Sequence, residues 1–174
     1  MTTDAADPGA GTAVPLAAAS AATRAFPRQG TVLAQERPGV PPYAVDLLAG
    51  RHRSTADEPR EVGGGDLGPD PYELLSSALA ACTAMTIRMY ARCKGWELGP
   101  VRVAVHHGKV YAQDCAACET KAGKVDRFER VIEVEPGLTP EQRAKVLEMA
   151  EKCPVHRTLH GEVEVLTRLS AAKG

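Results

Sequence analysis

Residues 70–83 read Asp-Pro-Tyr-Glu-Leu-Leu-Ser-Ser-Ala-Leu-Ala-Ala-Cys-Thr and mark the sharp beginning of a long helix. Asp70 is a favourable N-cap, and Pro71 suits the first helical position because its missing N–H has no partner there anyway. Glu73 stands three residues after the cap, as in a capping box. The segment therefore predicts a helix that begins at Pro71.

The apolar residues that follow recur at steps of three and four, which is the period of a helix with one buried face. Gly95 and the preceding Lys94 are typical of a helix end, so we expect the helix to run to about Cys93. The apolar positions are Leu75, Leu79, Cys82, Met85 and Met89.

Strands are predicted on both sides of this helix from alternating apolar residues bounded by turn residues. The predicted strands cover residues 29–35, 43–49, 51–56, 101–105, 128–135 and 163–167. The run Gly63-Gly64-Gly65 is expected to be a flexible connector, because it lacks the Lys-Ser/Thr ending of a phosphate-binding loop.

A second helix is predicted to open at Thr139, with a first-turn proline and Gln142 at the capping-box position. Pro154 interrupts it, and Cys153 before that proline is biased out of the helical region, where it can cap a short helix over residues 154–159. The resulting order, βββ-α-ββ-α-β, indicates an α+β fold.

The bulk composition favours one ordinary domain in a reducing compartment. The chain has 174 residues and a net charge of −1, which does not indicate a nucleic-acid partner. Residues 1–25 are expected to be a disordered tail, and residues 26–170 a single domain. The tail has no positive n-region and no apolar run approaches a membrane span, so we expect a cytoplasmic protein without a membrane partner. Aromatic residues make up only 4%, which suggests that a partner subunit adds burial.

The cysteines are the candidate reactive residues of this chain. The chain has five cysteines without a regular spacing, which favours reduced thiols over a disulfide framework. Cys82 lies on the first helix, and Cys153 lies at a helix end beside His156 and Arg157, where a thiolate can be tuned. The alternative is that Cys82 is a small core residue, which is common for a free cysteine.

A second thiol pair, Cys115-x-x-Cys118, leaves three interpretations open. It could be a redox dithiol, half of a zinc site with His106 or His107 as a neighbour, or two incidental loop thiols. A strand would place the two histidines on opposite faces, so only one of them could join such a metal site.

The chain resembles the OsmC/Ohr family, whose members include thiol-dependent hydroperoxide reductases. The resemblance rests on Gly68–Leu75, Ala80–Thr83 and Cys153–Val155, and it extends over residues 29–169. It implies an OsmC-like α+β fold in an intertwined homodimer, with two central helices and active sites at the subunit interface. It also implies reduction of organic hydroperoxides in oxidative stress defence, an external dithiol as reductant, and no bound organic cofactor.

The resemblance also implies roles for particular residues. Cys82 matches the peroxidatic position and Cys153 the resolving position. Arg37 is the best match to the catalytic arginine of the family, with Arg51 and Arg53 as competitors. The family's catalytic glutamate follows the helix-opening proline directly; Tyr72 stands there in this chain, and Glu73 comes one residue later.

An apolar substrate pocket is expected beside Cys82, lined by Leu75, Leu79 and Met85. A peroxide with an apolar tail would suit it. A second function keeps the same dimer and pocket but uses them to bind a small apolar ligand without catalysis. The presence of Tyr72 at the expected glutamate position favours this alternative.

Overall fold

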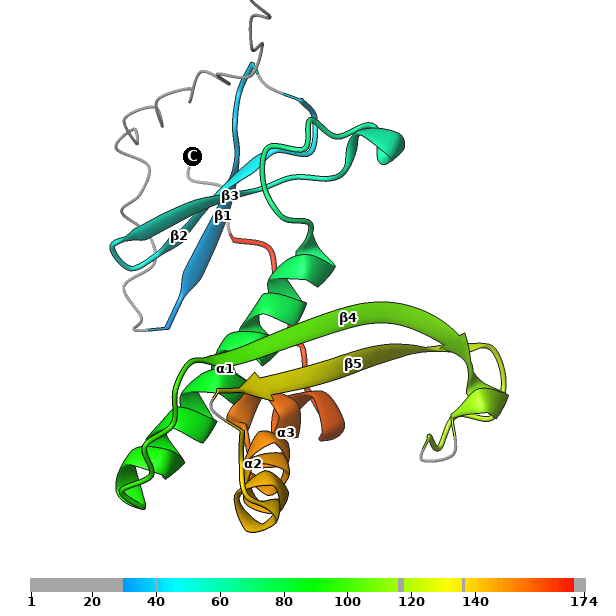
Figure 1. Cartoon of the computed structure of the whole chain (residues 1–174). Helices are drawn as coiled ribbons and strands as arrows, with labels where there is room; N and C mark the ends of the chain where they lie inside the picture. Colours follow the sequence, from blue (N-terminus) through cyan, green and yellow to red (C-terminus); the bar gives the residue numbers. More distant parts are fainter. Residues whose placement is uncertain (1–29, 40, 116–117, 136, 171–174) are drawn as a thin grey trace, which may run out of the picture.

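Two antiparallel sheets and three α-helices make up the described chain, residues 30–39, 41–115, 118–135 and 137–170, in this computed structural model (Figure 1). The predicted α+β class is confirmed, while the predicted tail over residues 1–25 lies outside the described residues. The elements are β1 (Val32–Glu36), β2 (Val45–Ala49), β3 (His52–Ala56), the 3-10 turn η2 (Arg60–Val62), α1 (Pro71–Cys93), β4 (Val101–Tyr111), the 3-10 turn η3 (Ala112–Asp114), β5 (Lys124–Val134), α2 (Pro140–Glu151) and α3 (Pro154–His160).

Helix α1 begins and ends where the sequence predicts. The Asp70 carboxylate accepts a hydrogen bond from the Glu73 main-chain N–H at 2.8 Å, and the Glu73 carboxylate accepts one from the Asp70 N–H at 2.9 Å. The helix ends at Cys93, and Gly95 follows with a φ of 65°. Its buried residues recur every four positions, which gives one continuous face toward the core: Leu79, Thr83, Ile87 and Ala91.

By length and composition alone, α1 could also cross a membrane, with a mean hydropathy of 1.2. However, one side of it packs on β4, α2 and α3. A core helix of a folded domain therefore accounts for the same composition.

Strands β4 and β5 form a long hairpin that covers α1. Their register runs from Val101 opposite Val134 to Tyr111 opposite Lys124, so both strands are longer than the sequence predicts. Figure 1 shows the hairpin lying across α1, with its far end, which carries η3, projecting beyond the helices. The core beneath it consists of Ile87, Val146 and Met149, with Tyr90, Leu98, Val101, Ile132 and Leu138 packed around them.

Strands β1, β2 and β3 form a separate antiparallel sheet in sequence order. Within the described residues, this sheet packs extensively on neither the helices nor the β4–β5 hairpin. Most of its side chains are exposed or half-buried, and full burial is confined to its margin at Ala44 and Ala56. A three-stranded sheet needs a covered apolar face to be stable, and this sheet lacks such a covering layer among the described residues.

The connection between β3 and α1 differs from the predicted flexible connector. Asp57 is 2% exposed, and its carboxylate accepts hydrogen bonds from the main-chain N–H groups of Glu58, Gly65 and Leu67. A Cβ atom at Gly64 would lie 1.8 Å from the Glu58 carbonyl oxygen. The glycine there allows a close approach of two backbone segments. The loop is therefore an organised structure that fixes the start of α1.

The predicted final strand over residues 163–167 is wrong for the single chain. After α3, the described residues 161–170 contain no strand, and Val163 and Val165 are exposed. A strand forms only where a neighbouring strand pairs with its N–H and C=O groups. No such neighbour lies beside this segment in the part of the chain that the structure describes.

Candidate functional site

Two cysteines from different helices meet in the centre of the molecule. Cys82 comes from the middle of α1 and is half-buried, whereas Cys153 is the N-cap of α3 and is 0% exposed. Packing of α1 against α3 brings them together, and a side-chain hydrogen bond links the two thiols. The structure thus places side by side the two residues that the family resemblance pairs.

The two thiols have different tendencies to ionise. Burial raises the pKa of Cys82, and its hydrogen bond to Cys153 raises it further. Burial also acts to raise the pKa of Cys153, but hydrogen bonds from Cys82 and from the His156 main chain act against it, and the pKa of Cys153 is lowered. The pair therefore holds one negative charge more readily than two isolated buried thiols would.

Arg130 supplies a guanidinium that is bonded to Thr83, a neighbour of this pair. It lies on β5 at an inward-facing position, and its Nη1 donates hydrogen bonds to Thr83 Oγ1 at 2.9 Å and to the Ala150 carbonyl oxygen at 3.0 Å. Thr83 is 0% exposed, and its hydroxyl donates to the Leu79 carbonyl oxygen at 2.7 Å. Thr83 also lies beside Cys153, so it stands between the cation and the buried sulfur.

Sequence reasoning missed Arg130, although a signal was present. The residue interrupts an alternating run between Phe128 and Ile132, where the strand pattern calls for an apolar side chain. A charged residue at such an inward position needs a polar partner. The partners, Thr83 and the Ala150 carbonyl group, come from helices that the strand pattern alone cannot place.

A cleft of about 920 Å³ opens between α1, the hairpin and the two C-terminal helices. Of the three residues predicted to line a substrate pocket, Leu75 and Leu79 line this cleft, while Met85 does not line it and is exposed. Arg130 also lines it, as does His156, whose main chain bonds Cys153, so the cleft reaches a partner of the thiol pair. Other lining residues include Tyr72, Cys115, Cys118, Val125, Asp126, Arg127, Phe128, Ile132, Leu147, Ala150 and Leu159.

A stacked aromatic cluster supports the outer part of the cleft. The His107 ring stacks on Tyr72 with ring centroids 4.2 Å apart, and it also contacts Phe128. His107 Nε2 lies 2.8 Å from Asp126 Oδ1, and this hydrogen bond lowers the pKa of Asp126. Tyr72, which stands at the family's glutamate position, is thus held as an aromatic wall of the cleft.

His156 also lines the cleft, and its imidazole ionises less readily than that of an ordinary histidine. Burial lowers the pKa of His156, and the nearby His160 and Arg130 lower it further. The imidazole therefore tends to stay uncharged near neutral pH, and Arg130 remains the cation at the thiol pair.

Arg37 and Glu73 do not reach the thiol pair within one chain. Arg37 is engaged on the β1–β3 sheet, where it forms an ion pair with Asp46 and donates to Thr55 Oγ1 at 2.8 Å. Glu73 belongs to the capping box, and nine residues separate it from Cys82. That spacing rotates the two side chains roughly 180° apart around the helix and about 13 Å apart along it.

Cys115 and Cys118 are joined by a disulfide at the far end of the hairpin. A zinc site would need these sulfurs as free thiolates, and no three His, Cys, Asp or Glu side chains gather as metal ligands among the described residues. The redox interpretation is the one of the three that this bond favours.

Comparison with known proteins gives one family match. The sequence model of the family described as OsmC-like protein matches residues 63–168, which include α1, the hairpin and both central cysteines. No curated protein matches the chain.

Several solved structures are similar to this one. The organic hydroperoxide resistance protein OsmC from Legionella pneumophila has a TM-score of 0.50 at 23% identity, covering 75% of this chain and 90% of that chain. An organic hydroperoxide resistance protein from Elizabethkingia anophelis gives 0.55 at 18% identity, with coverages of 76% and 89%. The organic hydroperoxide resistance protein OhrB of Bacillus subtilis gives 0.52 at 17%, with 77% and 92%. At these identities the likeness establishes the fold.

Proposed function

The chain belongs to the OsmC-like protein family, and on that premise we propose that it is a thiol-dependent peroxidase that reduces organic hydroperoxides in oxidative stress defence. The observation that supports this most is the hydrogen-bonded pair Cys82 and Cys153, with the Arg130 guanidinium bonded to the same Thr83 that contacts Cys153. The pair holds one negative charge readily, and a cysteine attacks an oxidant as its thiolate.

The exposure of the two cysteines supports the proposed roles. Cys82 is half-buried and accessible in part, whereas the Cys153 sulfur has no exposed surface. A peroxide can therefore reach Cys82 first. The proton that the two sulfurs share moves to Cys153 when Cys82 becomes the attacking thiolate.

The proposed reaction has two steps that balance. The Cys82 thiolate attacks the terminal oxygen of the hydroperoxide, the O–O bond breaks, and the alcohol leaves with the proton from Cys153, which gives Cys82 sulfenic acid. The Cys153 thiolate then attacks the sulfenic sulfur, which forms the Cys82–Cys153 disulfide and releases hydroxide, and the hydroxide takes a proton from solvent to become water. An external dithiol restores both thiols by exchange.

The cleft provides the substrate environment in this proposal. Leu75, Leu79 and Phe128 offer apolar surface for the carbon chain of an organic peroxide, while Arg130 lies at the inner end. A guanidinium stays charged and can hold an oxygen that gains negative charge as the O–O bond breaks.

We also propose that the protein works as a cytoplasmic homodimer. The cycle needs reduced thiols, which a reducing compartment maintains. Met85 and Met89 on α1 are 65% and 68% exposed, and no other described element packs extensively on the β1–β3 sheet. A second copy would bury both surfaces.

The decisive experiment measures peroxide consumption by the purified full chain with dithiothreitol and cumene hydroperoxide. Cys82→Ser is expected to abolish turnover, and Cys153→Ser to allow one oxidation followed by loss of activity. Cys93→Ser, which removes an exposed thiol away from the pair, is the control and should retain turnover.

The alternative is a non-catalytic protein that binds a small apolar ligand. The size of the cleft and the aromatic wall at Tyr72 favour it. Retention of a ligand by the wild-type protein together with no peroxide loss would support that function and refute the peroxidase. Turnover that survives Cys82→Ser would also refute the assignment.

A further inference from the structure

The Cys115–Cys118 disulfide occupies an unusual position for a structural bond. It joins two cysteines that are three positions apart in the sequence, at the free end of the β4–β5 hairpin, and their Cα atoms are 5.4 Å apart. Both cysteines are half-buried and both line the cleft that reaches a partner of Cys153. The two sulfurs therefore lie where a small molecule in the cleft can meet them.

The disulfide adds little to the stability of the hairpin. A disulfide stabilises a fold chiefly by closing a loop of the unfolded chain, and this effect is smallest for short loops. Here the loop contains only two intervening residues, and β4 and β5 are already paired from Val101–Val134 to Tyr111–Lys124. The Ala112 N–H also bonds the Gly123 carbonyl oxygen at 2.9 Å, which closes the hairpin end independently.

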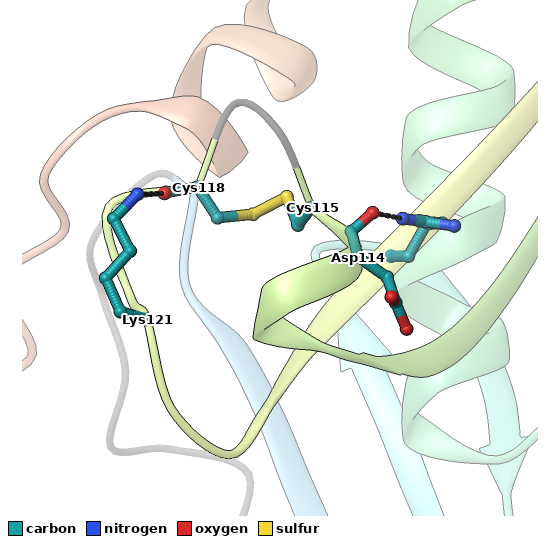
Figure 2. The surroundings of a disulfide bond; sticks show 5 residues. Asp114, Cys115, Cys118 and Lys121 are labelled. Atoms are coloured by element: carbon teal, nitrogen blue, oxygen red, sulfur yellow. Dashed lines mark hydrogen bonds between the residues drawn. A yellow bond between two sulfur atoms is a disulfide. The ribbon is translucent and has the colours of Figure 1, made fainter.

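Two cations are bonded to the backbone on either side of the disulfide. Lys121 Nζ donates to the Cys118 carbonyl oxygen at 2.8 Å, and Arg127 Nη2 donates to the Asp114 carbonyl oxygen at 3.1 Å. Figure 2 shows the disulfide between these two contacts, with Lys121 beside Cys118 and Asp114 next to Cys115. Nearby positive charge stabilises a thiolate, which is the leaving group when a disulfide is attacked.

We propose that Cys115 and Cys118 form a second redox-active site, a thiol–disulfide exchange centre whose substrate is a dithiol entering the cleft. This proposal goes beyond peroxide reduction and does not require it. Partial exposure, the short ring and the flanking cations are the features of a labile disulfide rather than of a structural staple.

The exchange balances in two steps. A thiolate of the dithiol attacks one sulfur of the pair, the Cys115–Cys118 bond breaks, and the other cysteine leaves as a thiolate. The second thiol of the dithiol then loses its proton. It attacks the first sulfur of the same dithiol, which is the one bonded to the protein in the mixed disulfide. The dithiol leaves as a disulfide, and two electrons and two protons have passed to Cys115 and Cys118.

The test uses the wild-type full chain in glutathione buffers of graded reduced-to-oxidised ratio. Acid quenching, alkylation and peptide mass mapping report the oxidised fraction of each cysteine. We expect the Cys115–Cys118 pair to pass reversibly from oxidised to reduced within this series. Cys93, an exposed single thiol, is the internal control and should form only a mixed disulfide with glutathione.

A pair that stays oxidised in the most reducing buffer would overturn the proposal in favour of a structural bond. A reduced pair that retains one zinc per chain and resists oxidation would overturn it in favour of a metal site. A single variant, Cys115→Ser, should trap glutathione on Cys118, and absence of that adduct would also contradict an exchange centre. Because none of these readouts uses peroxide, failure of the peroxidase proposal would leave the test intact.

Discussion

The thiol of Cys82 on α1 is hydrogen-bonded to the thiol of Cys153 at the beginning of α3. This contact joins two helices that are distant in sequence, and it makes the ionisation of each sulfur depend on the other. One thiolate per pair is favoured, and a second is opposed by the charge of the first.

We predict that Cys82→Ala raises the pKa of Cys153. The hydrogen bond from Cys82 lowers the pKa of Cys153 below its ordinary value of 9.0, so removing the donor leaves burial to raise it. At a pH just below 9.0, less Cys153 should be ionised, and its alkylation should become slower in the variant than in the wild type. Peptide-resolved alkylation rates across a pH series measure this.

The control for this experiment is Cys93→Ala, which removes a thiol outside the pair. It should leave the pH profile of Cys153 unchanged. An unchanged Cys153 profile in Cys82→Ala would show that the two thiols do not interact in solution.

We predict that Glu73 acts as a helix cap and not as a catalyst. Glu73→Gln keeps an acceptor for the Asp70 N–H, so both stability and peroxide turnover should stay close to wild type. Asp70→Ala removes the cap at the other side of the box and should lower the free energy of unfolding by about 0.5–2 kcal/mol. Denaturant unfolding and turnover assays measure the two effects, and loss of turnover in folded Glu73→Gln would assign it a chemical role.

Local signals in the sequence predicted the elements well but not their contacts. The Asp70 and Thr139 capping boxes both form, because a cap depends on residues within one turn. Cys82 and Cys153 meet as the family resemblance implies. The strand over residues 163–167 does not form in one chain, because a strand depends on a neighbour that the local pattern cannot supply.

The position of Arg130 likewise could not be predicted from local sequence. The family resemblance favoured Arg37, whose guanidinium is bonded to Asp46 and Thr55 on its own sheet. Arg130 reaches Thr83 only because β5 packs across α1, which is a tertiary relationship. The glycine run likewise looked flexible, although the buried Asp57 organises that loop.

We predict that Met89→Glu weakens the proposed homodimer. Met89 is 68% exposed on the side of α1 that also carries Cys82, and a carboxylate buried in an apolar interface is costly. Sedimentation should show a shift from dimer toward monomer. Val62→Glu is the matched control, since Val62 is 59% exposed on η2, and it should leave the assembly unchanged. A wild-type monomer would contradict the dimer itself.

We predict that Arg130→Met lowers peroxide turnover at least about tenfold, equivalent to about 1.4 kcal/mol of activation free energy. The change removes the guanidinium and the hydrogen bonds to Thr83 Oγ1 and the Ala150 carbonyl oxygen. It leaves the Ala150 carbonyl group without this donor, so the free energy of unfolding should also fall, by about 1–3 kcal/mol. Steady-state turnover and denaturant unfolding measure the two losses separately.

Two further substitutions isolate the role of the guanidinium. Arg130→Lys keeps the charge but cannot reproduce the planar fork, so its turnover should fall between those of wild type and Arg130→Met. Arg37→Met removes the ion pair with Asp46 and should retain turnover, because Arg37 does not contact the thiol pair within one chain. If Arg37→Met abolished turnover in a folded protein while Arg130→Met did not, the cation would have to come from the β1–β3 sheet of a second copy.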